Sequence, residues 1–335
     1  MEAYIYHAPG HNPYENLAIE EFFTEYVTEH AEKSIAIVYF WQNEDSVIFG
    51  RNQNVASESN LSLMQQWNVH PVRRKTGGGA VFHDIRNLNF SFIVSKKKYN
   101  KEASMLIIRD ALRQLGIPAE INGRNDILLE DAKISGNAYS SNESMSLHHG
   151  TLLLSVDLDK LERLLTVDQS KLQSKGVHSV RSRVQNLQEH YPLITIDEYK
   201  DAISKQFCKC YEIEHLETFT VSFDHMAVIQ KIKQQYASPQ WIFGHDLSQL
   251  RSMTKRFSWG TCTVGYFATD TEDEYVDLYS DTLYAEEFEQ VRQYIRRTSF
   301  IQKCNEEAIQ NVQFPEIERI MLHDIEELIS SQNEE

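Results

Sequence analysis

The stretch that decides the fold of this 335-residue chain is RRKTGGGAVFHD, from Arg73 to Asp84. Strand-forming residues follow three consecutive glycines, which indicates a sheet that bends at glycine. The glycine N–H groups can form a concave site for a carboxylate or a phosphate, and Arg73 and Arg74 add charged donors beside it. The alternative is a tight hairpin turn that binds nothing. The stretch lacks the Gly-Lys-Ser/Thr ending of a Walker loop and the helix that follows a dinucleotide fingerprint.

A second polar segment follows further along the chain. Asn125 and Asp126 offer oxygen ligands, and magnesium prefers few protein ligands together with water. Lys133, followed by Ser135 and Gly136, is a strand lysine that can neutralise charge as it develops on a carboxylate or an acyl phosphate. The alternative for this segment is a surface turn with a solvated lysine.

The segment from Lys171 to Arg183 is basic and rich in hydroxyl groups, although the whole chain is acidic. Such local positive charge suits a nucleotide or an acidic partner domain, and an exposed linker is equally compatible with it. His148 and His149 are adjacent in a predicted strand and therefore point to opposite faces of the sheet. We expect one buried, hydrogen-bonded histidine and one exposed histidine rather than a metal site.

Composition limits the class of protein. The chain has 41% hydrophobic and 24% charged residues, which is typical of a folded protein, and its length predicts one larger and one smaller domain. The net charge of −16 argues against a nucleic-acid partner, because neutralising phosphates supplies much of that affinity. No apolar run approaches the roughly 20 residues that span a bilayer, so we expect no membrane association. The first residues lack a secretory signal, and we expect a cytoplasmic protein.

The predicted strands and their short connections favour a mixed, mainly antiparallel sheet. Residues 34–41 and 46–50 are strand-forming and are predicted to pair as a hairpin. Turn residues at 237–244 indicate a boundary between a large domain, residues 1–247, and a small α/β domain, residues 248–335. The other predicted elements are helices at 12–22, 61–67 and 102–115, strands at 127–129, 133–135 and 150–156, a loop at 140–146 and a hairpin at 256–267.

Four motifs in a fixed order give the chain a family resemblance. It resembles the lipoate-protein ligases, in the long form that has a C-terminal accessory domain, and the likeness covers nearly the whole chain. The motifs are residues 73–84, 123–126, 133–138 and 148–153, followed by matching segments at 175–187, 241–244 and 256–260.

The resemblance implies an α+β fold with a sheet core similar to that of biotin protein ligases and class II synthetases. Residues 1–247 would bind lipoate and ATP, and residues 248–335 would form the accessory domain. The implied reaction activates lipoate with ATP and Mg²⁺ as lipoyl-AMP and then transfers the lipoyl group to a lysine of a carrier. The implied carriers are lipoyl domains of 2-oxoacid dehydrogenase acyltransferase subunits or the glycine cleavage H protein, and the sequence leaves the choice between them open.

The resemblance also implies roles for single residues. Lys133 would be catalytic by contacting both the lipoyl carbonyl and the phosphate, and Asn125 with Asp126 would lie near magnesium. Contacts to ATP or the adenylate are implied for Arg74, Gly79, Ala80, Val81, Phe82, Lys133, Lys175, Val177 and Arg183. Contacts to lipoate are implied for Arg73, Gly77, Gly78, His83, Lys133, Gly136 and His149. The chain departs from the family at Thr76, where serine is common, and at Ser140, where some members have arginine.

Two other functions remain open from the sequence. A transferase of the same fold would carry the acyl group as a cysteine thioester. The four cysteines, Cys208, Cys210, Cys262 and Cys304, lie outside all three polar segments, and their spacing indicates neither a disulfide framework nor a zinc site. A non-catalytic module would bind lipoyl domains without turnover, and ATP–pyrophosphate exchange in the presence of lipoate separates such a module from a ligase.

Replacing all four cysteines by serine is expected to leave lipoylation largely intact, because activation by ATP needs no thiol. The measurement is transfer of lipoate to a carrier domain by the purified variant, with its folding checked by circular dichroism. Loss of transfer in a folded variant, or isolation of an acyl thioester from the parent protein, would favour the transferase instead.

Overall fold

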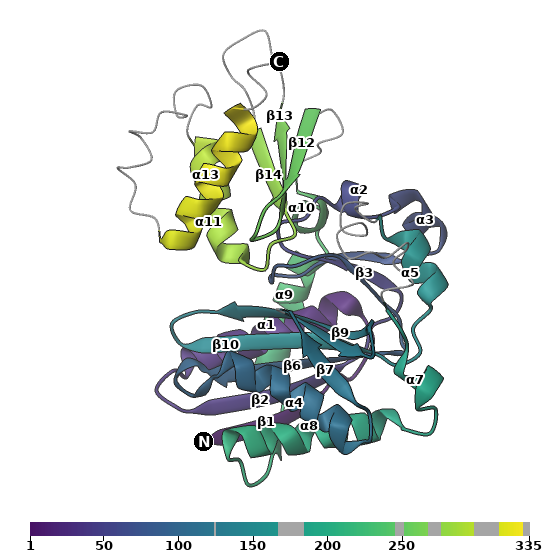
Figure 1. Cartoon of the computed structure of the whole chain (residues 1–335). Coiled ribbons are helices and arrows are strands. Elements are labelled where there is room, and N and C mark those ends of the chain that lie inside the picture. Colours follow the sequence, from purple (N-terminus) through teal and green to yellow (C-terminus); the bar gives the residue numbers. More distant parts are fainter. Residues whose placement is uncertain (124, 167–183, 245–250, 267–275, 298–314, 331–335) are drawn as a thin grey trace. The chain divides into compact units, whose positions relative to one another are not determined.

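The computed structural model describes residues 1–123, 125–166, 184–244, 251–266, 276–297 and 315–330 (Figure 1). Within these residues, no helix has both the length and the apolar content needed to cross a membrane. The chain packs into two compact units. Unit 1 comprises Met1–Ile48, Ala56–Val72 and Val81–Ile242, and unit 2 comprises Phe49–Val55, Arg73–Ala80 and Phe243–Glu335. The division of the sequence into domains between residues 247 and 248 stays a prediction.

Unit 1 is built on an eight-stranded sheet with the order β11-β1-β2-β6-β10-β9-β8-β7. The pairings of β1 with β2 and with β11 are parallel, and the other pairings are antiparallel. This confirms the predicted mixed, mainly antiparallel sheet of an α+β protein. The strands are β1 (Glu2–His7), β2 (Ile35–Trp41), β6 (Asn87–Ser95), β7 (Ala119–Asn122), β8 (Asp126–Leu129), β9 (Ala132–Ser141), β10 (Met145–Leu153) and β11 (Glu217–Thr218).

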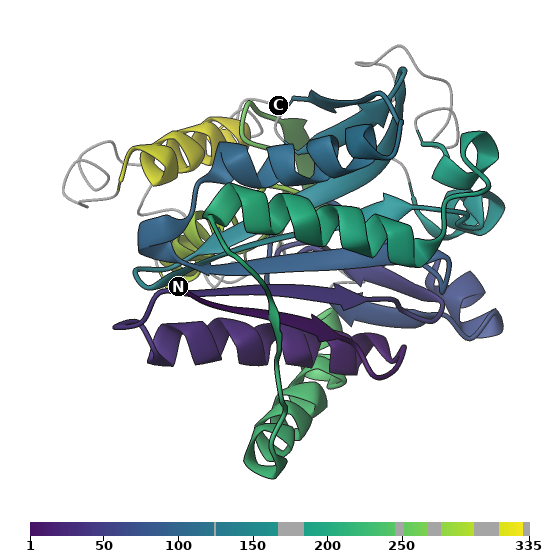
Figure 2. The same cartoon turned by 90° about the horizontal axis from the view of Figure 1, so that it is seen from below.

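Helices cover both faces of this sheet (Figure 2). The α4 face is covered by α4 (Lys101–Gln114) and α8 (Ile196–Tyr211), and the α1 face by α1 (Pro13–Glu29) and α9 (Phe223–Tyr236). The central strand β2 contributes its even-numbered residues to the core of the α4 face and its odd-numbered residues to the core of the α1 face. A strand buried on both faces is hydrophobic along its whole length, as β2 is.

The ends of the helices follow from local chemistry. Asn12 caps α1 by accepting a hydrogen bond from the N–H of Glu15 at 3.0 Å, and Pro13 occupies the first turn. Helix α4 ends before Gly116, whose φ of 82° favours glycine. The predicted helices at 12–22, 61–67 and 102–115 are confirmed by α1, α3 (Leu61–Gln66) and α4. The other helices described before residue 245 are α2 (Val55–Glu58), α5 (Leu158–Leu164), α7 (Leu187–His190), α10 (Pro239–Phe243) and the 3₁₀ helix η1 (Lys96–Lys98).

A second, three-stranded sheet has the order β4-β3-β5, formed by β4 (His70–Arg73), β3 (Ser46–Phe49) and β5 (Val81–His83). Strand β3 therefore does not pair with β2, and the predicted hairpin of residues 34–41 and 46–50 is wrong, although both strands exist. The connection explains the difference. The buried side chain of Asn43 accepts a hydrogen bond from Asn16 at 2.9 Å and lies 3.2 Å from His83 Nδ1, which directs the chain from one sheet into the other.

The predicted loop at residues 140–146 is also wrong over most of its length. Strand β9 continues to Ser141, strand β10 starts at Met145, and Ser141 pairs with Ser146. The hydroxyl groups of these two serines lie 2.5 Å apart. This cross-strand hydrogen bond stabilises the hairpin where the apolar alternation that would predict a strand is missing.

The C-terminal part of unit 2 is a small α/β fold, as predicted. An antiparallel sheet of β12 (Arg251–Arg256), β13 (Thr261–Tyr266) and β14 (Val276–Ser280) packs with α11 (Ala285–Arg297) and α13 (Glu316–Ser330). The predicted hairpin at 256–267 includes β13, but the prediction missed most of β12, the strand that pairs with it. Strand β12 is an edge strand with mainly polar residues, so periodicity does not reveal it.

Gly150→Ala is expected to destabilise unit 1 by about 1–3 kcal/mol, because overpacking a filled core displaces its neighbours. A Cβ at this position would lie 2.4 Å from Asn137 Oδ1 and 2.5 Å from Phe90 Cζ. The matched control is Gly10→Ala, where a Cβ would have no atom within 4 Å. Urea unfolding followed by tryptophan fluorescence measures both variants, and equal midpoints would contradict the close packing at Gly150.

Candidate active site

A band of buried polar residues lies on the α1 face of the large sheet. The even-numbered apolar residues of β6 belong to the core of the α4 face, so alternation places Asn87, Asn89 and Ser91 on the α1 face. All three are buried. Because buried polar groups cost free energy unless they are hydrogen-bonded, a band of this kind needs partners on the same face.

Glu20, a buried carboxylate on α1, is the partner of Ser91 in this band. Its Oε1 accepts a hydrogen bond from Ser91 Oγ at 2.5 Å, and its two oxygens lie 2.9 and 3.0 Å from His149 Nδ1. Ser91 Oγ in turn accepts a hydrogen bond from Trp41 Nε1 at 3.0 Å. Residues of one helix (α1) and three strands (β2, β6 and β10) thus form a hydrogen-bonded polar wall beside the indole ring of Trp41.

His83 joins the same group from the small sheet. Its ring makes an edge contact with Trp41, with 6.0 Å between the centroids, and its Nδ1 faces the side-chain amide of Asn43 at 3.2 Å. The two histidines predicted to contact lipoate are therefore connected to one tryptophan. His83 touches Trp41 directly, and His149 is linked to it through Glu20 and Ser91.

A β-bulge brings Lys133 onto the α1 face. The register between β8 and β9 shifts, because Ile127 pairs with Ser135 and Leu128 pairs with Lys133, which leaves Ile134 as the extra residue. Ile134 points into the core of the α4 face. Without the extra residue, alternation would place Lys133 on that same apolar face.

Lys133 shares the α1 face with Gly136 and Ala138, which pair with Asp126 and His149 on the neighbouring strands. Its Nζ forms an ion pair with Asp126 Oδ1 at 2.7 Å, and the two side chains are 26% and 17% exposed. This partial burial strengthens their interaction relative to a surface pair and leaves the ammonium group accessible to a substrate.

Gly136 provides the space that Lys133 occupies. A Cβ at Gly136 would lie 2.9 Å from both Cε and Nζ of Lys133. The N–H of Gly136 donates to Thr151 Oγ1 at 3.3 Å, which ties β9 to β10 beside the lysine. Gly136, which was predicted to contact lipoate, therefore also has a structural role, because any larger residue would displace Lys133.

Asn125 is held by Asn137, which lies across the β8–β9 hairpin. The side chain of Asn125 donates to the main-chain oxygen of Asn137 at 2.9 Å, and its own main-chain oxygen accepts from the N–H of Asn137 at 3.0 Å and from its side-chain amide at 3.1 Å. Asn137 Oδ1 lies 2.9 Å from His148 Nε2. These contacts fix Asn125 directly before Asp126, the first residue of β8.

His148 and His149 point to opposite faces, as predicted, but both are buried. Their exposed fractions are 0% and 7%, so the expectation of one exposed histidine is wrong. The reason is that helices cover both faces of the sheet. Burial lowers the pKa of His148 well below its usual range, and the neighbouring His149 lowers it further, so His148 is neutral at physiological pH.

The chemistry of Asn125 and Asp126 fits magnesium. A carboxylate and an amide oxygen are ligands that this ion accepts when water and phosphate oxygens complete its shell. Among the described residues, no group of three or more His, Cys, Asp or Glu side chains is arranged to hold a metal ion. Any magnesium at this pair would therefore depend on the phosphates of a bound nucleotide.

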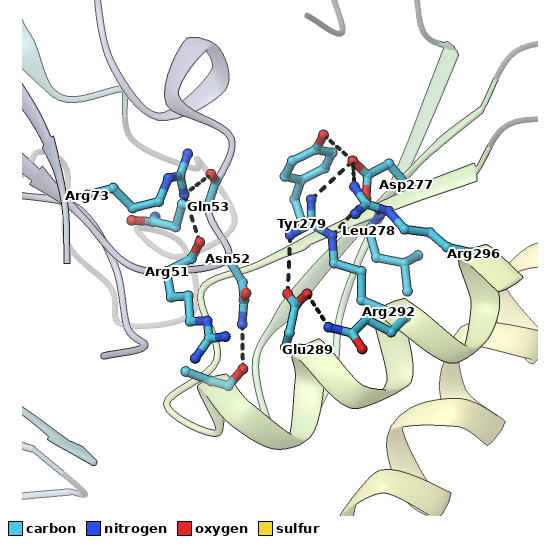
Figure 3. Close-up of polar contacts among 12 residues, drawn as sticks. Arg51, Asn52, Gln53, Arg73, Asp277, Leu278, Tyr279, Glu289, Arg292 and Arg296 are labelled. Atoms are coloured by element: carbon cyan, nitrogen blue, oxygen red, sulfur yellow. Dashed lines mark hydrogen bonds and ion pairs between the residues drawn. The ribbon is translucent and has the colours of Figure 1, made fainter. Parts of the chain in front are cut away.

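In unit 2, Arg73 holds the turn that follows β3. Its Nη1 donates to the main-chain oxygens of Arg51 at 2.8 Å and Gln53 at 2.7 Å (Figure 3), and to that of Gly50 at 3.1 Å. Burial lowers the pKa of Arg73 to about 10, with a further contribution from the positive charge of Arg292. The guanidinium group stays charged at neutral pH and stabilises the turn, while its predicted contact with lipoate stays a prediction.

Arg74 organises the glycine segment. Its Nε donates to Thr76 Oγ1 at 3.0 Å, and its Nη2 donates to the main-chain oxygens of Gly77 at 2.6 Å and Gly79 at 2.9 Å. Gly78, between them, has a φ of 92°, a conformation that favours glycine. Arg74 and Gly78 therefore stabilise the same turn, while the anion site that the sequence suggested here stays a prediction.

The glycines also let main-chain segments of unit 2 approach one another. The N–H of Gly78 donates to the oxygen of Thr282 at 2.8 Å. A Cβ at Gly77 would lie 2.2 Å from that same oxygen, and a Cβ at Gly50 would lie 2.0 Å from the oxygen of Gly78. Packing against the protein's own main chain is thus a reason for these glycines in addition to the predicted anion site.

A buried ion cluster in unit 2 was not predicted from the sequence. Asp277 is hydrogen-bonded to Arg292 Nε at 2.8 Å, to the hydroxyl group of Tyr279 at 2.8 Å and to Arg296 (Figure 3). Burial alone would raise the pKa of Asp277, but these hydrogen bonds and the charge of Arg292 outweigh it and lower the pKa. The only signal in the sequence was an acidic residue between two apolar residues of a strand.

Sequence reasoning also missed Glu20, Ser91 and Trp41. The alternation Asn87-Leu88-Asn89-Phe90-Ser91-Phe92 is visible in the sequence, but it is typical of a strand with one solvent-exposed face. Only the helix packed over this face reveals the polar residues as buried. Glu20 had no signal, because a glutamate in an amphipathic helix is usually exposed.

The other predicted residues are placed as follows. Val81 and Phe82 lie in β5, paired with Ile48 and Val47. A Cβ at Gly79 would have no atom within 4 Å, so space is open beside this residue. The predicted adenylate contacts Lys175, Val177 and Arg183, with the rest of residues 171–183, lie outside the described residues.

In unit 1, the described cysteines lie on the opposite face of the sheet from Lys133 and His149. Cys208 and Cys210 belong to α8, on the α4 face of the sheet, and Cys262 is in the core of unit 2. Burial raises the pKa of all three thiols, which disfavours the thiolate that an acyl-carrying cysteine needs.

Comparison with known proteins identifies relatives of the whole chain. The family model for the lipoyl protein ligase A/B catalytic domain matches residues 12–208. The lipoate-protein ligase A of Bdellovibrio bacteriovorus is 36% identical over 308 residues, covering 90% of this chain and 89% of the relative. The lipoate-protein ligase A of Blochmanniella floridana is 35% identical over 322 residues, covering 93% and 94%.

Solved structures share the fold. P. falciparum LipL1 in complex with lipoate has a TM-score of 0.81 at 24% identity, covering 97% of this chain and 98% of that one. A lipoate-protein ligase A bound with ATP has a TM-score of 0.63 at 26% identity, covering 73% and 99%. A bipartite lipoate protein ligase of Thermoplasma acidophilum, solved with its E2 lipoyl domain, has a TM-score of 0.64 at 27% identity, covering 73% and 97%.

The catalytic-domain match spans more than half of the chain and includes the polar band, Asp126 and Lys133. Both relatives align with nine tenths of the chain or more, which confirms the resemblance found in the motifs. The chain belongs to the lipoate-protein ligase A family.

Proposed function

We propose that this protein activates lipoate with ATP as lipoyl-AMP and transfers the lipoyl group to a lysine of a carrier domain. The observation that carries the proposal is the ion pair of Lys133 and Asp126 on the polar face of the sheet. Membership of the family supports the reaction, as do the lipoate complex of P. falciparum LipL1 and the ATP complex of a lipoate-protein ligase A.

The reaction has two steps. In the first, a carboxylate oxygen of lipoate attacks the α-phosphorus of ATP, the bond to the β-phosphate breaks, and pyrophosphate leaves. In the second, the amine of the carrier lysine attacks the acyl carbon, and AMP leaves with the bridging oxygen. Negative charge is brought together in the first step, so a cation that neutralises it accelerates adenylation.

In our proposal, Lys133 supplies the positive charge that neutralises the lipoate carboxylate and the phosphate. Its ammonium contacts the lipoate carboxylate and then the phosphate of the adenylate, while Gly136 leaves room for the side chain. His83 and His149, with the Trp41 and Glu20 that orient them, line the proposed lipoate site. A wall held by internal hydrogen bonds needs no rearrangement when the substrate arrives, which favours binding.

The nucleotide would be bound by Arg74 and by the main chain of Gly79, Ala80, Val81 and Phe82. Arg73, Gly77 and Gly78 are assigned to lipoate in the same proposal. Mg²⁺ would be held near Asn125 and Asp126 and would neutralise the phosphates of ATP.

The partners that we propose are lipoyl domains of 2-oxoacid dehydrogenase acyltransferase subunits, the glycine cleavage H protein, or both. The Thermoplasma acidophilum ligase solved with its E2 lipoyl domain supports the first of these. We place the reaction in the cytoplasm, where ATP is available.

Lys133→Ala is expected to lower the rate of ATP–pyrophosphate exchange with lipoate by about 10²–10³, the usual value of an electrostatic group that acts in the transition state. The control is Lys97→Ala, because Lys97 is an exposed lysine of η1. Such a surface change costs about 0.5 kcal/mol of stability or less and should leave the rate unchanged. If both variants exchange pyrophosphate as fast as the parent, Lys133 is not the activating residue.

Gly136→Ala is expected to lower pyrophosphate exchange at least about tenfold, because the methyl group displaces the lysine ammonium from its position. The loss should appear mainly in kcat, since the lysine acts in the transition state. Gly10→Ala is again the control. A fully active Gly136→Ala variant would show that the position of Lys133 over this glycine is not needed.

A further inference from the structure

The end of β9 that carries Lys133 is not paired with β10. The pairing of β9 with β10 reaches only as far as Asn137 and Gly150. Lys133 lies four residues beyond this last pair and therefore needs another partner for the side of the strand that faces away from β8. A buried or half-buried main-chain oxygen without such a partner would destabilise the strand.

The segment Val184–Gln185 takes the place of β10 at this end. Val184 forms an isolated parallel bridge with Lys133, and the main-chain N–H of Gln185 donates to the oxygen of Lys133 at 3.1 Å. Lys133 is therefore held on one side by its pairing with Leu128 in β8 and on the other side by Gln185.

The side chain of Gln185 adds a second bond to the same hairpin. Its Nε2 donates to the main-chain oxygen of Leu129 at 2.6 Å, and its Oε1 lies 3.2 Å from His190 Nε2 in α7. Leu129 is the last residue of β8 and pairs with Ala132, next to Lys133. One residue thus connects both strands of the β8–β9 hairpin with a helix outside the sheet.

This connection lies beside the β-bulge of the hairpin. The β-bulge at Ile134 interrupts the regular ladder directly beside Lys133, and a bulge allows the strand to bend. The ammonium group of Lys133 sits at the end of a long side chain whose path over Gly136 depends on the position of its main chain.

We propose that Gln185 is a positioning residue for Lys133, acting through the main chain of the β8–β9 hairpin. The inference rests on the proposed role of Lys133 in adenylation. Gln185 sets where the ammonium group lies, and it contributes to the rate only through that group. A residue that merely stabilised the fold would lower the amount of folded protein and leave the kinetic constants of the folded fraction unchanged.

The first test compares Gln185→Ala with Gln188→Ala. Gln188 is three residues further on and bonds through its main-chain N–H to the oxygen of Leu154. Gln185→Ala is expected to lower kcat for pyrophosphate exchange about tenfold, with KM for lipoate and ATP changed less than about twofold, because a misplaced lysine weakens the transition state most. Gln188→Ala should match the parent protein.

Gln185→Met keeps the length of the side chain without its amide. It is expected to behave like Gln185→Ala, because the bond to the oxygen of Leu129 is lost in both. Full activity of the methionine variant would overturn the proposal, since packing alone would then suffice.

The decisive test combines Gln185→Ala with Lys133→Ala in a double-mutant cycle. If Gln185 acts through Lys133, the double variant exchanges pyrophosphate as slowly as Lys133→Ala alone. If the two losses multiply, Gln185 acts independently and the proposal is wrong. A Lys133→Ala variant as fast as the parent would contradict the proposed function itself, whereas a slow Lys133→Ala with a fast Gln185→Ala would contradict only the role of Gln185.

Discussion

The covering of both faces of the eight-stranded sheet by helices is the constraint on which the candidate active site depends. Polar groups on the α1 face are shielded from water and must bond to one another. Glu20, Ser91, Trp41 and His149 do so in one connected group. Because a hydrogen-bonded buried network favours one arrangement of its members, it provides a rigid wall on the face that also carries Lys133, the proposed catalytic lysine.

A single extra residue in β9 makes this arrangement possible. Ile134 fills the apolar core of the α4 face, and the bulge that it creates leaves Lys133 on the opposite, polar face. The site thus gains a cation without placing a charge in a core. The cost is a locally irregular strand, which Gly136 accommodates and Gln185 supports from outside.

In unit 2, arginines and glycines stabilise the main chain itself. Arg73 and Arg74 donate hydrogen bonds mainly to main-chain oxygens. Asn52, shown in Figure 3, bonds to the main chain of Ser280 and Ala285 and so links the same region to the C-terminal fold. The positive charge of Arg292 is balanced by the buried Asp277. The arginines and glycines that suggest an anion site are therefore also what holds this main chain together.

The sequence by itself determined the family, the α+β class and the main helices, because motif order, capping residues and helical periodicity are local properties of the chain. It also identified Lys133 as a candidate catalytic residue and Asn125 with Asp126 as candidate magnesium ligands, whereas the ion pair of Lys133 and Asp126 came from the structure. Only the tertiary structure decided that β2 and β3 belong to different sheets, that both His148 and His149 are buried, and that Glu20 faces Ser91. Which face of a strand is covered, and by what, depends on elements more than a hundred residues apart, such as β10 and α1, and no local pattern records that contact.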